Sequence, residues 1–167
     1  MQANYNCVDG GSGVATCTGT VSTGSNINTT TPGVLTFAVN AADNVSNSSS
    51  QSIQYKVSYN ICLLYDPTKA KHPGSTYPIN IALCDANRVN LSTAAVIVHA
   101  VSVTLASTDA PGILADAGNA NPDMDFRFDS SSYIFNLKTT ELGIGTYNLN
   151  FTAGSDPSTH AVQFQIK

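Results

Sequence analysis

The 167-residue chain has no tryptophan, and charged residues make up only 11% of it. A typical soluble domain carries about 25% charged residues. Glutamate occurs once, at Glu141, and the long-chain helix formers Lys, Arg, Gln and Met are scarce, whereas Ser, Thr and Asn are abundant. Such residues favour strands and turns over helices. The composition therefore excludes a helical bundle or coiled coil, disfavours an α/β nucleotide-binding enzyme and predicts an all-β fold.

Positive charge and long apolar runs are also missing. The seven Lys and Arg residues are spread along the chain, and the net charge is −4. Nucleic-acid binding needs clustered cations, so this class is excluded. No apolar run approaches the roughly 18 residues of a membrane-spanning helix, so we expect no membrane span. The residues after Met1 are polar, unlike a secretion signal. We expect a piece of a longer protein, with the neighbouring domains of that protein as its partners.

Four cysteines, Cys7, Cys17, Cys62 and Cys84, allow three disulfide pairings. Cys7 and Cys17 flank a turn-forming stretch at 9–13, which favours a local bond between them and leaves Cys62 to pair with Cys84. A zinc site is the alternative, but no two cysteines have the spacing of a zinc knuckle. Disulfides predict an oxidising compartment, which is extracellular or at the cell surface.

Alternating apolar residues predict short strands separated by turn residues. The predicted strands cover residues 34–39, 53–59, 79–83, 95–105, 133–137, 147–151 and 162–166. The first two flank a turn at 41–47 and predict an antiparallel hairpin with one buried face. A change of phase near Ala100 predicts a bulge, with Val101 and Val103 both in the core. The last three strands are typical of a β-sandwich.

Two stretches carry a family resemblance, YNCVDGGSGVATCTGTV at 5–21 and FAVNAADNVSN at 37–47. They are similar to the second and third strands and to the late hairpin of bacterial immunoglobulin-like repeats. The resemblance implies that residues 1–59 form a partial module, which is truncated or borrows a strand elsewhere.

Five further stretches carry a second resemblance, at 65–70, 74–79, 83–87, 133–138 and 145–151. They are similar to the PxKF-type domain of bacterial cell-surface proteins, and this resemblance covers residues 60–167. The Pro-x-Lys-Phe motif itself is replaced by Pro78, Ile79, Asn80 and Ile81.

The two resemblances together imply an all-β fold of two immunoglobulin-like β-sandwich modules in tandem, the first incomplete. The implied function is a non-catalytic structural or adhesion module, acting as a stalk, spacer or assembly unit of a bacterial cell-surface or secreted protein. Self-association through an edge strand is expected if the missing strand leaves the first sheet open.

Acidic residues gather in one segment, because five of the eleven acids lie between Asp109 and Asp129. Calcium prefers six to eight oxygen ligands, which carboxylate and amide side chains supply. The candidate calcium ligands are Asn119, Asn121, Asp123, Asp125 and Asp129. The EF-hand pattern itself is absent. The alternative is a solvated loop in which Phe126 and Phe128 point inward. A second oxygen cluster at 43–47 is typical of Asx turns.

Glycan binding usually relies on exposed aromatic rings. Tyr5, Tyr65 and Tyr77 are the candidates for such exposure, whereas the other aromatics fall on core positions of strands. A glycan- or calcium-binding module appended to a secreted hydrolase is therefore the alternative function. The sequence contains no signal for a cofactor or for catalysis by this chain itself.

Overall fold

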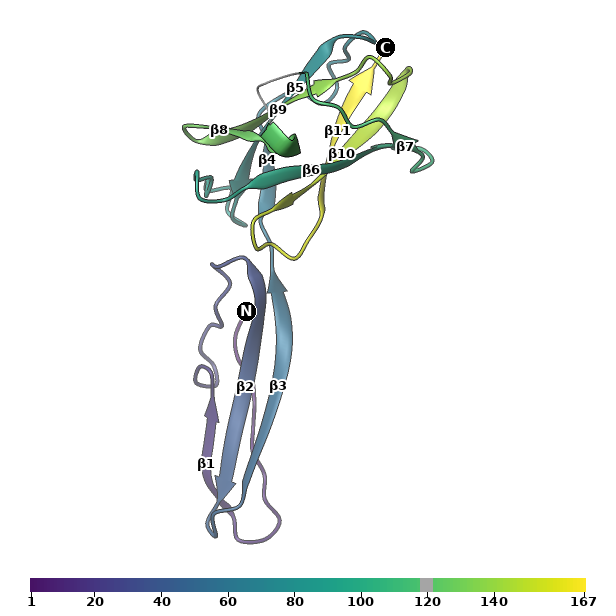
Figure 1. The fold of residues 1–167 in the computed structure, drawn as a ribbon. Coiled ribbons are helices and arrows are strands. Elements are labelled where there is room, and N and C mark those ends of the chain that lie inside the picture. Colours follow the sequence, from purple (N-terminus) through teal and green to yellow (C-terminus); the bar gives the residue numbers. More distant parts are fainter. Residues whose placement is uncertain (118–121) are drawn as a thin grey trace. The chain divides into compact units, whose positions relative to one another are not determined.

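The computed structural model describes residues 1–117 and 122–167. Within these residues the chain is all-β, as the composition predicts, apart from one 3₁₀ turn, η1, at Pro122–Met124 (Figure 1). The chain divides into two compact units, Met1–Val57 and Ser58–Lys167. The boundary expected between residues 59 and 60 thus lies close to the observed one.

The unit Met1–Val57 contains one sheet of three antiparallel strands, β1 (Val14–Gly19), β2 (Gly33–Asp43) and β3 (Ser48–Val57). β2 is the central strand, and β1 and β3 are the edges. β2 and β3 form the predicted hairpin, and Phe37 lies directly opposite Ile53. Because directly opposed residues share a face, Phe37 and Ile53 lie on the same side of the sheet.

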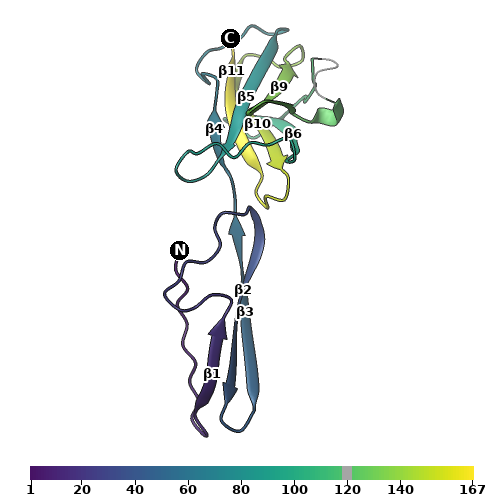
Figure 2. The ribbon, with the colours of Figure 1, turned by 90° about the vertical axis from the view of Figure 1, so that its left-hand side faces the viewer.

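Coil segments, rather than a second sheet of comparable length, cover this face of the unit (Figure 2). The ring of Tyr5, which precedes β1, packs 5.9 Å from the ring of Phe37. The hydroxyl of Tyr55 donates a hydrogen bond of 3.0 Å to the carbonyl of Asn28, which lies between β1 and β2. This cover does not reach Ile53, whose side of β3 is open: the residue is 67% exposed. The predicted buried face is therefore wrong at this position.

The unit Ser58–Lys167 contains two four-stranded sheets with antiparallel pairing throughout. The first has the order β4 (Asn60–Leu63), β5 (Thr76–Cys84), β9 (Ser132–Lys138) and β8 (Arg127–Asp129). The second has the order β11 (His160–Ile166), β10 (Gly145–Ala153), β6 (Val98–Leu105) and β7 (Pro111–Gly112).

Aromatic contacts join these two sheets into a sandwich-like core. The ring of Phe126 lies 5.1 Å from Phe135 on β9 and 5.4 Å from Phe151 on β10. The ring of Tyr77 on β5 lies 5.3 Å from Phe164 on β11. The most deeply buried large side chains are Tyr133, Phe135, Phe151, Phe164, Ile79, Ile81, Leu83, Leu137, Leu149 and Ile166. The alternation predicted for β5, β9, β10 and β11 is confirmed by this burial pattern.

β6 contains the predicted bulge, but its consequence differs from the prediction. Asn150 pairs with Ser102 and Phe151 pairs with Ala100, so Val101 is passed over in the ladder with β10. The extra residue turns Val101 outward, where it is 51% exposed, while Ala100 and Val103 stay buried. The prediction that Val101 lies in the core is therefore wrong.

A short segment from the long β4–β5 connection crosses to the other sheet. Lys71 forms a parallel bridge with Ile166 of β11. The Lys71 N–H donates to the Gln165 carbonyl, and the Lys167 N–H donates to the Lys71 carbonyl, both at 3.0 Å. The outer edge of β11 is thereby engaged at its C-terminal end.

Candidate functional site

Three aspartates, Asp9, Asp43 and Asp85, close turns in the same way. One carboxylate oxygen of each accepts hydrogen bonds from the backbone N–H groups two and four residues further along the chain. These bonds are 2.6 to 3.2 Å long. The residues are therefore local turn braces, which is the role that short polar side chains commonly take between strands.

Asp43 has the most extensive set of such bonds. Its second oxygen accepts a 2.7 Å hydrogen bond from the side-chain amide of Asn47. This hydrogen bond is the main cause of a lowered pKa for the Asp43 carboxyl. The neighbouring Asn44 side chain donates instead to the Ser12 carbonyl at 2.8 Å and so fastens the β2–β3 turn to the turn before β1. The oxygen cluster at 43–47 thus forms the Asx-type turn expected from the sequence.

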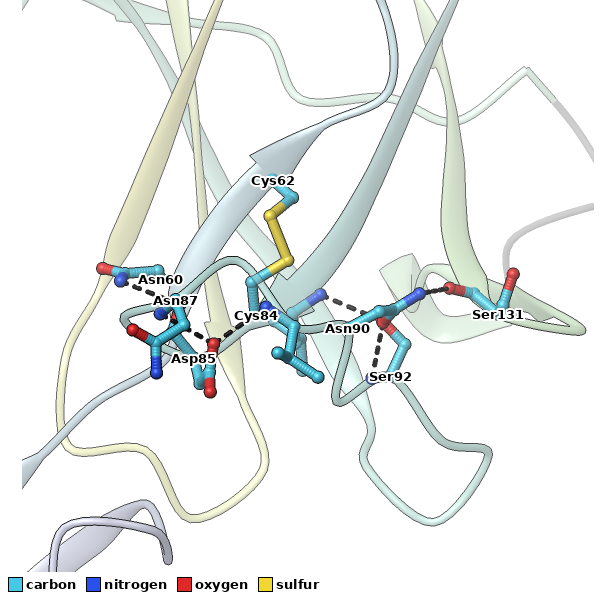
Figure 3. The surroundings of a disulfide bond; sticks show 10 residues. Asn60, Cys62, Cys84, Asp85, Asn87, Asn90, Ser92 and Ser131 are labelled. Atoms are coloured by element: carbon cyan, nitrogen blue, oxygen red, sulfur yellow. Dashed lines mark hydrogen bonds between the residues drawn. A yellow bond between two sulfur atoms is a disulfide. The ribbon is translucent and has the colours of Figure 1, made fainter.

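The Cys62–Cys84 disulfide braces one end of the larger unit, where it links β4 to β5 (Figure 3). The Asn60 side-chain amide donates to the Asp85 carbonyl at 3.1 Å, and the Asn90 amide donates to the Ser131 carbonyl at 2.7 Å. The other bond, Cys7–Cys17, joins the coil before β1 to β1 itself. Both bonds have the partners that the cysteine spacing favours.

A hollow of about 580 Å³ lies beside the free edge of β4. Its lining residues are Asn60, Ile61, Cys62, Leu63, Ala86 and Arg88. Arg88 is the one charged residue in this lining, and no carboxylate accompanies it. Acid–base catalysis needs a group that can exchange a proton near the working pH, which a guanidinium cannot do. The hollow therefore offers a cationic contact rather than a catalytic pair.

The candidate calcium ligands lie only partly within the described structure. Asn119 and Asn121 lie outside the described residues. Asp123 is exposed in η1, and Asp129 is exposed at the end of β8. Among the residues that the structure describes, no three His, Cys, Asp or Glu side chains gather closely enough to hold a metal ion. The calcium site stays a prediction.

Asp125 is bound to a histidine instead of standing free. Its carboxylate lies 2.7 Å from Nδ1 of His99 on β6, and both side chains are partly exposed. The next residue, Phe126, donates its N–H to the Val98 carbonyl at 2.8 Å. The pair thus fastens the segment before β8 onto β6, while Phe126 is buried and Phe128 is half-buried, as expected from the alternation.

A second histidine–carboxylate pair joins Asp156, in the β10–β11 turn of the larger unit, to His160 at the start of β11. The Asp156 side chain is fully buried, and its carboxylate lies 2.8 Å from Nε2 of His160. It also accepts hydrogen bonds from the N–H groups of Tyr59, at 2.7 Å, and Ser158, at 2.8 Å. Burial alone would raise the pKa of Asp156, but these hydrogen bonds lower it on balance.

The position of this pair shows that Asp156 connects distant parts of the chain. Its carboxylate holds Tyr59, the second residue of the unit, against the β10–β11 turn. The hydroxyls of Ser58 and Ser158 are also hydrogen bonded to each other, at 2.6 Å. The ring of His160 stacks on Phe151 at 5.6 Å. The sequence suggested only a turn at 154–158. The one local signal for this pair was an aspartate four residues before a histidine.

The three candidate tyrosines for glycan binding are not an exposed aromatic row. Tyr77 is buried, so the expectation that it is exposed is wrong. Its hydroxyl donates to the Lys69 carbonyl at 2.8 Å, and that of Tyr65 donates to the Gln163 carbonyl at 2.6 Å. Burial raises the pKa of Tyr65 far above its usual value. Tyr5 is half-buried against Phe37. These rings serve mainly in packing.

Within the described residues, no helix is long and apolar enough to cross a membrane. The comparisons with known proteins are also negative: no protein-family model matches the chain, and no curated protein matches it.

Proposed function

We propose that the chain is a non-catalytic structural or adhesion module that acts as a stalk, spacer or assembly unit of a bacterial cell-surface or secreted protein. The observation that carries this proposal is the use of its aspartates. Asp9, Asp43 and Asp85 brace turns, whereas Asp125 and Asp156 fasten distant segments together. Groups used in this way stiffen a scaffold.

The strand order of the larger unit supports an immunoglobulin-like identity. In such domains strands A, B, E and D form one sheet, and C, F and G form the other, with C′ added next to C in variable-type domains. The orders β4-β5-β9-β8 and β11-β10-β6-β7 match A-B-E-D and G-F-C-C′. The disulfide departs from the antibody pattern, because it joins the positions of A and B instead of B and F.

The smaller unit supports the incomplete half of the proposal. Its order β1-β2-β3 matches C-F-G, the second sheet alone. The other layer is reduced to a bridge between Gln2 and Asn26, with flanking hydrogen bonds from Ala3 to Ser25 and from Ile27 to Met1. We infer that this unit is a partial module in tandem with a complete one.

An extracellular or cell-surface location is part of the proposal. Two disulfides suggest an oxidising environment, because reducing conditions inside cells disfavour such bonds. The low content of charged side chains also suits a surface whose contacts change little with salt concentration.

A hydrolysis assay tests the non-catalytic part of the proposal. The chain, a His99→Ala variant and a His72→Ala variant are incubated with chromogenic esters and glycosides. His99 pairs with Asp125, whereas His72 is an exposed loop residue that serves as the matched control. We expect no turnover above buffer from any of the three. Turnover that His99→Ala abolishes and His72→Ala retains would overturn the proposal.

A further inference from the structure

β3 is an open edge of the sheet in Met1–Val57. It pairs with β2 on one side, in a ladder from Gly33–Val57 to Ala42–Ser48 without a register shift. β1 is the opposite edge of the same sheet (Figure 1). A long, regular edge strand presents unpaired N–H and C=O groups to any strand that can pair with it.

The hydrogen bonds of β2 show which residues of β3 point their backbone groups outward. The Ala38 carbonyl accepts from the Thr20 N–H at 2.8 Å, and the Ala38 N–H donates to the Thr20 hydroxyl at 2.9 Å. The Ala38 backbone therefore faces away from β3, and Ser52, which lies opposite, faces away from β2. By alternation, Ser50, Ser52, Gln54 and Lys56 direct their backbone groups to the open edge.

Ile53 lies between these outward-pointing residues and is the apolar position left uncovered. Its neighbour across the ladder, Phe37, is shielded by Tyr5, and the next inward residue on β3, Tyr55, is tied to Asn28. Ile53 itself remains largely exposed. The open edge thus combines unpaired backbone groups with one exposed apolar side chain at its middle.

The usual protections of an edge strand are sparse on β3. Edge strands are commonly shielded by proline, bulges or several charges. β3 has no proline and no bulge in its ladder with β2, and its one charged residue is Lys56. The last strand of the larger unit, β11, differs, because Lys71 engages its outer edge.

We propose that β3 binds the β3 strand of a second copy of this chain, antiparallel and centred on Ile53. A two-fold axis at this residue places Ile53 opposite Ile53 of the second copy, in a pair that is not hydrogen bonded. Such pairs have the shortest separation in an antiparallel sheet, with Cα atoms about 4.5 Å apart. Each exposed Ile53 then covers the other.

This register also gives the outward-pointing backbone groups of β3 hydrogen-bond partners and keeps the two Lys56 residues from facing each other. Ser52 pairs with Gln54 of the second copy and Ser50 pairs with Lys56, each in both directions, which gives about eight interchain backbone hydrogen bonds. Lys56 then faces a serine and not the second Lys56. The strand is therefore complementary to itself, which is the condition for an interface between identical copies.

The interface deepens the proposed role as an assembly unit, but the spacer role does not depend on it. One strand from each copy buries less than a standard protein interface, so we expect weak, concentration-dependent dimerisation. A chain that stays monomeric would overturn the dimer while leaving the proposed spacer function untouched, because the two depend on different measurements.

Cysteine cross-linking tests the register directly. Ile53→Cys places two thiols at the two-fold axis, within the Cα separation that a disulfide allows. Gln51→Cys is the matched control on the same strand and face. In the proposed register Gln51 lies opposite Tyr55 of the second copy, so two Gln51→Cys thiols are about 13 Å apart along the strand.

Under mild oxidation we expect a covalent dimer from Ile53→Cys and monomer from Gln51→Cys. Cross-linking of Gln51→Cys without Ile53→Cys, or of neither variant, would overturn the proposed pairing. Far-UV circular dichroism checks that both variants keep their sheets.

Sedimentation equilibrium provides the test without cysteines. The mass of the wild-type chain should rise above 17.4 kDa towards twice that value as the concentration increases. Ile53→Lys should remain monomeric, because it places two like charges at the axis. Ile144→Lys, at another exposed isoleucine in the larger unit, should dimerise like the wild type. A monomeric wild type, or equal association of all three, refutes the interface.

Discussion

Removal of the Cys62–Cys84 disulfide should change how the larger unit extends under force. Cys62 lies in β4, close to the first residue of this unit, and Cys84 ends β5. With the bond intact, a pull on the N-terminal side passes from Cys62 through the sulfurs to Cys84. Residues 63–83, which include the Lys71 contact with β11, then carry no load.

The expected size of the effect follows from the length of the closed loop. The two cysteines are 22 residues apart, and an extended residue contributes about 3.4 Å. The disulfide itself spans 6.1 Å between the two Cα atoms, so a Cys62→Ser/Cys84→Ser double variant should lengthen by about 70 Å more than the oxidised chain when the larger unit unfolds. Loss of the cross-link should also lower the free energy of unfolding of this unit by about 3 kcal/mol.

Single-molecule pulling from the two ends of the chain measures the length, and urea titration measures the stability. The double variant retains Cys7–Cys17, whose separation of 10 residues should add only about 28 Å when this bond is reduced in turn. This difference assigns each length change to one bond. An unfolding length that is identical in the wild type and the double variant would refute the bypass of residues 63–83.

Four further outcomes are expected. Asp156→Asn should lower the free energy of unfolding by about 2 kcal/mol in urea titration, because a buried charged acceptor is lost, while the exposed Asp129→Asn should change little. The pKa of Asp156 is lowered on folding, so its contribution to the free energy of unfolding is present above the unfolded-state pKa of about 4 and is lost as the pH falls further. The stability of Asp156→Asn should therefore depend less on acid than that of the wild type, which acid unfolding followed by circular dichroism measures. Val103→Ala should cost about 2 kcal/mol and Val101→Ala almost nothing in the same titration. The proposed spacer function predicts equal melting temperatures in calcium and in chelator, and a rise with calcium would instead favour the ligand-binding alternative.

The strands of the larger unit were the most predictable part of the fold. Apolar and polar residues alternate regularly along β9, β10 and β11, and turn-forming stretches separate these strands. This alternation directly indicates which side chains are buried between the two sheets. The exposure expected for Tyr77 is wrong, although Tyr77 continues the alternation of Ile79 and Ile81 on β5, which is a signal for a core position. The core position expected for Val101 is wrong for a different reason, because one bulge reverses the face of a single residue without changing composition.

The candidate site was less predictable, because its contacts join residues far apart in the sequence. Turn braces such as Asp43 depend on neighbours within four residues and were expected. The Asp156 contact with Tyr59 and the Asp125 contact with His99 depend on how distant strands pack, which no local pattern reports.

Ile53 shows the same limit and explains why the two units differ. Alternation assigns Ile53 to the face shared with Phe37, but it cannot say whether a second layer covers that face. Among the described residues, every buried hydrophobic side chain except Ala3 belongs to Ser58–Lys167, where two sheets cover each other. The smaller unit has only coil and one disulfide for this purpose. Any strand that pairs with β3 therefore extends a sheet and shields Ile53 at the same time, so the gain from association is greatest where the fold buries least.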